Sequence, residues 1–401
     1  MEKFVDYFNF LNSFFGLSVY SYNTNKKCYV KSYFKIIYSI TILVLTFLIF
    51  PRIIEILSDN VSEMSGNQLL SKLVCIFQTL FQLFLNIVLM FYKLLYCNKN
   101  ILNLNHYTMF KSMFNIKLNN GVVRKLNKYN DGRYIFILSS VILFFVQLVT
   151  NIIVMSAIIN YRIDKYPYIA FYIFTYFQLI SAGNIFYENI LQYKFMISCV
   201  NQTLSDYLEI YRYALKYRSK ARSILVSCNV SDDLNVMQKL NSEIYFSIRQ
   251  MIECESFTMS VVFLHNFLEI IVSLFYQFIG QVVYVDGFNN ERKLLEIFGI
   301  SYITCNIIAV LLYIAVCERM QEEMSTTAKI LHEFPVHKTD DRLKESINRF
   351  SLQILQEKRP ISVCGMFNVD NTLLYSMISS MTSYLILLVQ FQLQGVGSSK
   401  G

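Results

Sequence analysis

Long runs without charged residues constrain this sequence more than any other feature. A helix needs about 20 mostly apolar residues to cross the hydrocarbon core of a bilayer. Seven stretches reach or approach that length, and only one of them contains a charged residue, Glu269. With 16% charged residues and a mean hydropathy of +0.39, the composition is typical of a polytopic helical membrane protein, not of a soluble enzyme or a disordered chain. The predicted spans are Ile36–Pro51, Leu73–Tyr92, Tyr134–Tyr161, Tyr166–Tyr187, Ser256–Val285, Ile297–Cys317 and Asn371–Gln394.

The distribution of Lys and Arg predicts the orientation of these spans. If the N-terminus is cytoplasmic, the segments on the inside hold 29 of the 36 basic residues and those on the outside hold 7. None of the nine cysteines falls in an expected outside loop, so no extracellular disulfide is expected there. We therefore predict an all-α membrane protein with seven transmembrane helices, a cytoplasmic N-terminus and an extracellular C-terminus. That polarity is opposite to a G-protein-coupled receptor.

The first expected outside loop, Pro51–Lys72, contains a glycosylation sequon. Asn60-Val61-Ser62 fits the acceptor pattern. We predict Asn60 as the glycosylated residue.

The cytoplasmic segments are long enough to form structure of their own. Glu188–Glu255 contains neither proline nor glycine, which predicts helical extensions of the fourth and fifth spans. The segment 339–358 predicts an amphipathic helix, with Thr339 as its N-cap. Its apolar stripe has to be buried, either against this chain's own loops or in a subunit-assembly surface, and the sequence leaves both alternatives open. The stripe consists of Leu343, Ile347, Phe350 and Ile354.

The last forty residues carry the most specific motif. Gly365-Met366-Phe367-Asn368-Val369-Asp370 precedes the final span, which ends in Ser383-Tyr384, five apolar residues and Gln390-Phe391. This pattern resembles the C-terminal signature of the insect gustatory receptor family, with Ser383 in place of the usual threonine. Sugar-sensing members of that family tend to have Glu where this chain has Leu385. The resemblance therefore favours a bitter or plant secondary compound over a sugar as the tastant.

The resemblance implies a ligand-gated non-selective cation channel, a homotetramer or mixed tetramer in the plasma membrane of a sensory neuron. It implies a six-span ligand-binding bundle over 1–317, a cytoplasmic anchor over 318–366 and a pore-lining span with its tail over 367–401. Phe391 is expected to act as a hydrophobic gate. Gln390 could offer a polar surface to ions, or it could instead hydrogen-bond a neighbouring helix. The predicted pore and gate residues are Tyr384, Gln390, Phe391 and Gln394, and the expected partners are the tastant, monovalent and divalent cations and membrane lipid.

A ligand site reached from outside should lie in the outer halves of the spans. Aromatic walls with a few amides are a usual composition for a small-molecule site. The alternative is that the tyrosines form interfacial belts and the amides bond between helices. The candidate ligand-binding residues are Gln78, Gln147, Asn151, Tyr172, Tyr176, Glu269, Tyr276, Gln277 and Tyr302.

His265 and Glu269 lie four residues apart in the fifth span, where ionisable groups are costly and often functional. Glu269 could bind a cationic ligand such as an alkaloid, or it could pair with His265 and hold the spans together. Both alternatives remain at this stage.

The sequence contains no pattern that predicts enzymatic chemistry. It has no Gly-rich phosphate loop and no HExxH or CxxC pattern, and its four histidines are dispersed. We therefore expect no catalytic residues, no metal site, no cofactor and no nucleic-acid partner. The competing functions are an odorant-receptor-type channel and, with less support, a G-protein-coupled receptor.

Overall fold

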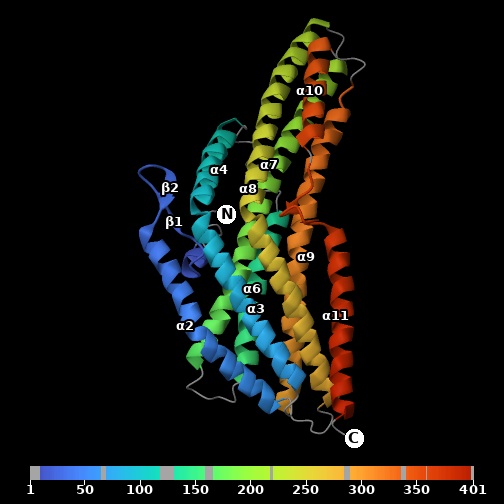
Figure 1. Ribbon diagram of the computed structural model, residues 1–401. Helices are drawn as coiled ribbons and strands as arrows, with labels where there is room; N and C mark the ends of the chain where they lie inside the picture. Colours follow the sequence, from blue (N-terminus) through green and yellow to red (C-terminus); the bar gives the residue numbers. More distant parts are fainter. Residues whose placement is uncertain are drawn as a thin grey trace.

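The computed structural model describes residues 10–64, 69–117, 131–158, 166–216, 220–283, 290–335, 340–357 and 359–398. Over the described residues, every predicted span falls on a helix, which confirms the all-α membrane architecture; the ends of two predicted spans, 159–161 and 284–285, lie outside those residues. Six of these helices contain a span long and apolar enough to cross a bilayer. In the remaining one, α6, the apolar stretch among the described residues is Leu138–Ile153. The seven helices are α2 Tyr33–Met64, α3 Leu69–Leu95, α6 Asp131–Ile158, α7 Tyr166–Lys216, α8 Lys220–Val283, α9 Asn290–His332 and α11 Asn371–Ser398 (Figure 1).

The first expected outside loop is shorter than predicted. Helix α2 continues through Pro51 to Met64, although a proline in a helix removes one backbone hydrogen bond. Ile53 and Ile56 are both buried just after it, so the part of α2 beyond the proline packs against the bundle. Asn60 therefore lies within α2, and its side chain falls outside the part of the chain that the structure describes.

Helices α7 and α8 are much longer than a bilayer requires. At about 1.5 Å per residue, the 64 residues of α8 extend roughly 96 Å, against about 30 Å of hydrocarbon. The surplus forms the predicted cytoplasmic extensions, at the top of Figure 1. The end of α11 lies at the opposite end of the molecule, as a C-terminus outside requires.

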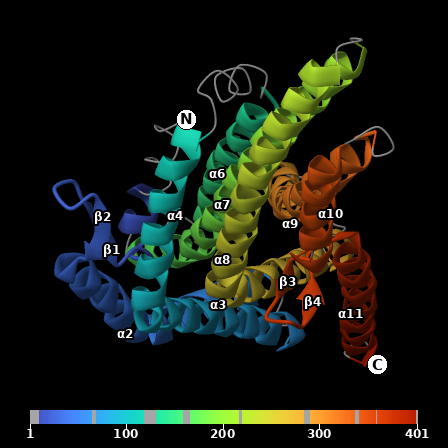
Figure 2. The same ribbon diagram turned by 90° about the horizontal axis from the view of Figure 1, so that it is seen from above.

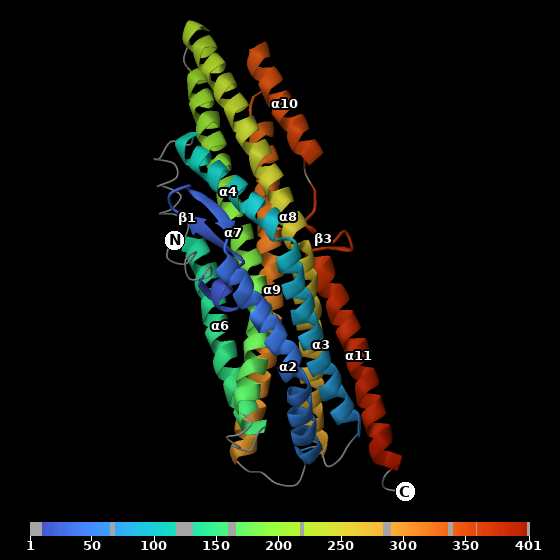
Figure 3. The same cartoon turned by 60° about the vertical axis from the view of Figure 1, so that its left-hand side comes forward.

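Helix α4 and a hairpin add to the cytoplasmic side. Helix α4, Cys97–Lys117, carries the hairpin of β1, Tyr20–Asn23, and β2, Cys28–Lys31 (Figure 3). Asn105 of α4 fastens this hairpin, because its amide accepts from the backbone N–H of Tyr29 at 2.6 Å and donates to the Tyr29 carbonyl at 3.0 Å.

Helix α10, Asp341–Glu357, packs on the far end of α8 and matches the predicted amphipathic helix. Its predicted cap, Thr339, lies outside the described residues.

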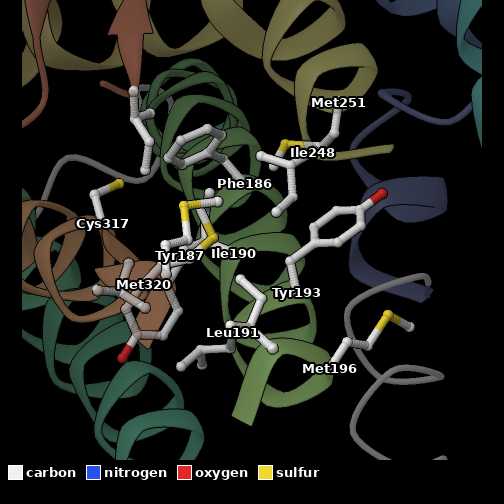
Figure 4. Close-up of a cluster of buried hydrophobic side chains, with 14 of the residues drawn as sticks. Phe186, Tyr187, Ile190, Leu191, Tyr193, Met196, Ile248, Met251, Cys317 and Met320 are labelled. Carbon is white, nitrogen blue, oxygen red and sulfur yellow. The ribbon is translucent and has the colours of Figure 1, made fainter. Parts of the chain in front are cut away.

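The main hydrophobic core lies where α7, α8 and α9 meet (Figure 4). Phe186 and Ile190 of α7, Ile248 of α8 and Cys317 of α9 are all buried there. The core thus extends from the membrane into the cytoplasmic extensions without a break at Glu188.

The Gly365–Asp370 motif forms the turn into the last helix. Strands β3, Ser362–Val363, and β4, Phe367–Asn368, pair in a tight hairpin beside the start of α11 (Figure 2). Gly365 has φ +69°, in the left-handed region that favours glycine. The ring of Phe367 packs edge-on against Phe263 of α8 at 6.1 Å. Asp370 caps α11 by accepting from the N–H of Thr372 at 2.9 Å.

Candidate functional site

Glu269 of α8 lies at the centre of a polar cluster in the outer half of the bundle. Its side chain is buried, with 3% exposed. Its Oε2 accepts a hydrogen bond from Gln78 Nε2 of α3 and another from the Tyr302 hydroxyl of α9, each at 2.9 Å. Three helices therefore meet at one carboxyl group.

A second group of amides and a tyrosine continues the cluster toward α6 and α7. Asn306 of α9 accepts from the Tyr176 hydroxyl at 3.0 Å and from Gln147 Nε2 at 3.4 Å. The ring of Tyr176 lies 5.8 Å from that of Tyr302. Asn306 follows Tyr302 by one helical turn on the same face.

His265 does not supply the described hydrogen bonds of Glu269. Its ring packs edge-on against Tyr176 at 5.4 Å, and its Nε2 has no hydrogen-bond partner among the described residues. Gln147 Oε1 is also buried and unpartnered in that part of the chain. Buried polar atoms are nearly always bonded, so these two unpartnered atoms mark the cluster as a candidate functional site.

The other ligand candidates lie at different distances from Glu269. Asn151 bonds one turn back to the carbonyl of Gln147 at 3.1 Å and is buried beside the cluster. Tyr172 packs with Cys75 in a neighbouring buried group that Tyr276 covers. Gln277 points elsewhere, because its Nε2 donates to the Glu296 carbonyl at 3.4 Å, near the start of α9. The structure thus brings together Gln78, Glu269, Tyr302, Tyr176 and Gln147, sets Asn151, Tyr172 and Tyr276 next to them, and leaves Gln277 apart.

The predicted pore residues lie on a helix that this chain barely covers. In the apolar 18-residue window of Asn371–Gln394, only 6% of the residues are buried, against 72% in the corresponding window of α7. Gln390 and Gln394 are exposed, and so are Tyr384 and Phe391. Tyr384 touches α8 edge-on at Phe267, with ring centroids 6.3 Å apart.

Gln392 is a polar residue of α11 that the sequence analysis did not single out. It is buried, with its Oε1 unpartnered among the described residues. It lies on a different face of the helix from Gln390 and Gln394.

The apolar stripe of α10 is buried within the chain. Leu343, Ile347, Phe350 and Ile354 all join the main core. This is the intrachain packing that the sequence left open as one alternative. An assembly role for these four residues stays a prediction. Leu352 and Leu355 are the exposed apolar residues of α10.

Comparison with known proteins identifies the family. The family model described as 7tm Chemosensory receptor matches residues 7–395. The chain belongs to this family. The match confirms the predicted resemblance and places the chain among chemosensory receptors, not enzymes.

Sequence relatives and a solved structure agree with this family. Putative gustatory receptor 28b of Drosophila melanogaster is 27% identical over 105 residues, 25% of this chain and 22% of that protein. The Drosophila gustatory receptor for bitter taste 66a is 41% identical over 63 residues, 16% of this chain and 12% of that protein. These matches span less than a quarter of either relative. The insect olfactory receptor OR5 from Machilis hrabei, solved in complex with eugenol, matches with a TM-score of 0.69 over 98% of both chains at 14% identity. This chemosensory receptor is therefore a multi-pass membrane protein with the seven-helix fold of insect receptors.

Proposed function

We propose that this chemosensory receptor is a subunit of a ligand-gated cation channel, opened by a small tastant at the plasma membrane of a sensory neuron. The observation that carries the proposal is α11, an apolar helix in whose membrane-spanning stretch only 6% of the residues are buried by this chain. A helix of that kind has to be covered by lipid or by other subunits. The side chains on the surface of α11 decide between lipid and other subunits.

The polar residues of α11 favour contact with other subunits and water. At 100° per residue, the predicted pore residues Tyr384, Gln390, Phe391 and Gln394 fall within an arc of about 120°. Two amides and a hydroxyl facing lipid would be costly, because hydrocarbon offers them no hydrogen-bond partner. Around a central axis the same arc lines a pore, with Phe391 as an apolar constriction that closes by dewetting. We infer a homotetramer or a mixed tetramer with related receptors, and lipid against the remaining faces.

The outer polar cluster supports a small-molecule site for the tastant. Glu269 is the acidic group within it, and the rings of Tyr176 and Tyr302 lie beside it. A carboxyl group flanked by aromatic rings suits a basic nitrogen, through ion pairing and cation–π attraction. We therefore propose a bitter plant compound with a basic nitrogen, in keeping with Leu385 at the position where sugar-sensing relatives tend to have Glu.

Current recordings from cells expressing the full chain test both parts of the proposal. The panel contains alkaloids, uncharged plant glycosides, sugars and volatile phenols. The volatile phenols test the alternative of an odorant-receptor-type channel. We expect alkaloid-evoked cation currents in wild type and a reduction of at least tenfold in alkaloid sensitivity in Glu269→Gln, at equal surface expression. Glu345→Gln, the same change at an exposed cytoplasmic carboxylate, should leave sensitivity unchanged.

The two parts of the proposal fail in different ways. Equal loss of current and surface expression in Glu269→Gln would mean that Glu269 only holds helices together. Ligand-evoked currents that persist unaltered in Phe391→Ala and Gln390→Ala would remove α11 from the pore.

A further inference from the structure

The N-terminal hairpin and the start of α2 carry four lysines and no carboxylate. Residues 10–45 contain Lys26, Lys27, Lys31 and Lys35 but neither Asp nor Glu. The first three are exposed, and none of the four forms an ion pair among the described residues. This surface therefore presents concentrated positive charge.

The carboxylates next to the hairpin already have cations of their own. Burial, and after it the charge of Glu255, raises the pKa of Tyr20, which places that carboxylate near the inner face of the hairpin. Both oxygens of Glu255 are bonded to Lys93. Glu253 lies 3.6 Å from Lys99 of α4. Neither acidic residue is available to match the hairpin lysines.

The base of the hairpin lies at the cytoplasmic surface of the membrane. Lys31 comes two residues before Tyr33, where the apolar span of α2 begins. Burial raises the pKa of the Cys97 thiol, and the ammonium of Lys31 lies near enough to oppose that rise. Cys97 follows the α3 span, which ends at Leu95. Tyr33 and Phe34 are 79% and 81% exposed, as aromatic side chains at the level of lipid headgroups are.

Lys35 extends the charged surface onto the first turn of α2. Its Nζ donates to Ser13 Oγ at 2.8 Å, which fixes the ammonium between α2 and the segment that precedes the hairpin. A lysine ammonium has three N–H donors, so this bond leaves donors for a phosphate oxygen.

The other two lysines lie farther from the membrane. Lys26 and Lys27 are in the turn between β1 and β2, which Figure 1 shows on the cytoplasmic side of the start of α2. At about 3.3 Å per residue, Lys27 lies roughly 13 Å from Lys31 along the strand. Cations at two heights fit a headgroup that projects from the membrane surface and carries phosphates on its far side.

Lipid can reach this surface. The hairpin and α2 lie on the opposite side of the molecule from α11 (Figure 2). Below the lysines, α2 exposes an apolar stripe at helical spacing, against which acyl chains can lie. The stripe consists of Tyr33, Ile37, Ile40 and Val44.

We propose that the hairpin and the start of α2 form a binding site for a multiply phosphorylated inositol lipid of the cytoplasmic leaflet. The phosphodiester lies at Lys31 and Lys35, and the ring phosphates reach Lys26 and Lys27. Clusters of four or more basic residues directly cytoplasmic of a membrane helix are typical of such sites. The site shares no residue with the outer polar cluster, so it is independent of the tastant.

The test is equilibrium binding to the purified full-length receptor in neutral detergent, followed by fluorescence anisotropy. The probes are fluorescent phosphatidylinositol 4,5-bisphosphate, phosphatidylserine and phosphatidylcholine. We expect saturable binding of the bisphosphate, at least tenfold tighter than that of phosphatidylserine and weaker at high salt. Soluble inositol 1,4,5-trisphosphate should displace the probe at least tenfold less effectively than unlabelled dioctanoyl phosphatidylinositol 4,5-bisphosphate, because it has no acyl chains to place on α2.

Two triple variants that remove equal charge separate a defined site from a general charge effect. Lys26→Gln/Lys27→Gln/Lys31→Gln should weaken binding of the bisphosphate at least tenfold. The control replaces three exposed lysines of the cytoplasmic extensions and α10, far from the membrane, and should bind as wild type does. It is Lys216→Gln/Lys239→Gln/Lys344→Gln.

A third variant and the melting temperature exclude a folding defect. Lys26→Arg/Lys27→Arg/Lys31→Arg keeps the charges and should retain binding within about threefold. All three triple variants should melt within about 2 °C of wild type, because the substituted side chains are exposed.

Four results would overturn the proposal. They are equal affinity for phosphatidylserine and the bisphosphate, displacement by the soluble trisphosphate as effective as by the lipid, equal weakening in the hairpin and control variants, and unchanged binding in the hairpin variant. Since the readout is lipid binding to purified protein, a failed tastant screen leaves the proposal intact.

Discussion

Removing one partner of the buried Lys93–Glu255 pair should destabilise the receptor strongly. The two side chains are 6% and 11% exposed, and the pair joins α3 to α8 at the inner edge of the predicted membrane region. Lys93→Met leaves the Glu255 carboxylate without its cation in a nearly buried position. Breaking a buried pair in this way costs about 3–5 kcal/mol. At roughly 2 °C per kcal/mol for a large domain, that is a fall of about 6–10 °C in melting temperature.

The chain offers a matched control for this measurement. Lys99 of α4 and Glu253 of α8 form another ion pair between helices, but at 3.6 Å and with about half of each side chain exposed. An exposed pair contributes about 0–1 kcal/mol, so Lys99→Met should shift the melting temperature by at most about 2 °C.

The double variant Lys93→Met/Glu255→Met completes the cycle. It removes both charges and should regain most of the loss, because apolar replacement of a whole buried pair is often neutral or stabilising. Melting can be followed by heating samples and measuring the height of the monodisperse peak that remains in fluorescence-detected size-exclusion chromatography. Equal shifts for Lys93→Met and Lys99→Met, or a double variant as unstable as the single one, would refute the reasoning.

The remaining predictions concern the turn into α11 and the sidedness of the chain. Asp370→Ala removes the α11 cap and should cost about 1 kcal/mol, seen as a lower melting temperature that Asp370→Asn largely restores. Gly365→Ala should cost about 1–2 kcal/mol because φ is +69°, and Gly365→Asn less; an unchanged melting temperature in the alanine variant would show that the turn relaxes. An epitope tag after Gly401 should be labelled by antibody on intact cells, and labelling only after permeabilisation would contradict the predicted orientation.

Much of the fold could be predicted because membrane helices follow from local composition. Each uncharged run predicts its own span, since a bilayer imposes the same length requirement everywhere. The absence of proline and glycine over Glu188–Glu255 predicts the cytoplasmic extensions for an equally local reason. The Gly365–Asp370 motif likewise has local causes, a left-handed turn and a helix cap.

The parts that the sequence left open depend on contacts between remote segments. Helix α2 passes through Pro51 because distant side chains bury Ile53, and no local rule contains that information. Periodicity predicted the apolar face of α10 but not whether α8 or another subunit covers it. Asn105 hydrogen-bonds Tyr29, which lies 76 residues earlier in the sequence. This contact places the N-terminal hairpin in the wall of a cytoplasmic cavity. Gln78, Glu269 and Tyr302 were named as candidates singly, and only the fold shows that they bond.

Helices α3 and α8 are joined by polar contacts at two levels, and this limits how they can move. Gln78 and Lys93 are 15 residues apart on α3, and Glu269 and Glu255 are 14 apart on α8, so both separations are about 21–22 Å. In the proposed channel, a ligand that parts Gln78 from Glu269 would leave the buried pair of Lys93 as the pivot.

Between the two contacts, Phe263 of α8 supports the hairpin that begins α11. It lies eight residues from Glu255 and six from Glu269 along α8. If α8 tilts as a rigid rod about the inner pair, Phe263 moves by slightly more than half of the displacement at Glu269. In the proposed channel this motion would reach Phe367 because the two rings pack together, and it would reach α11 because Asp370 caps that helix three residues later. Without the Lys93–Glu255 pivot, α8 can shift as a whole instead of tilting, and displacement at Glu269 no longer fixes displacement at α11.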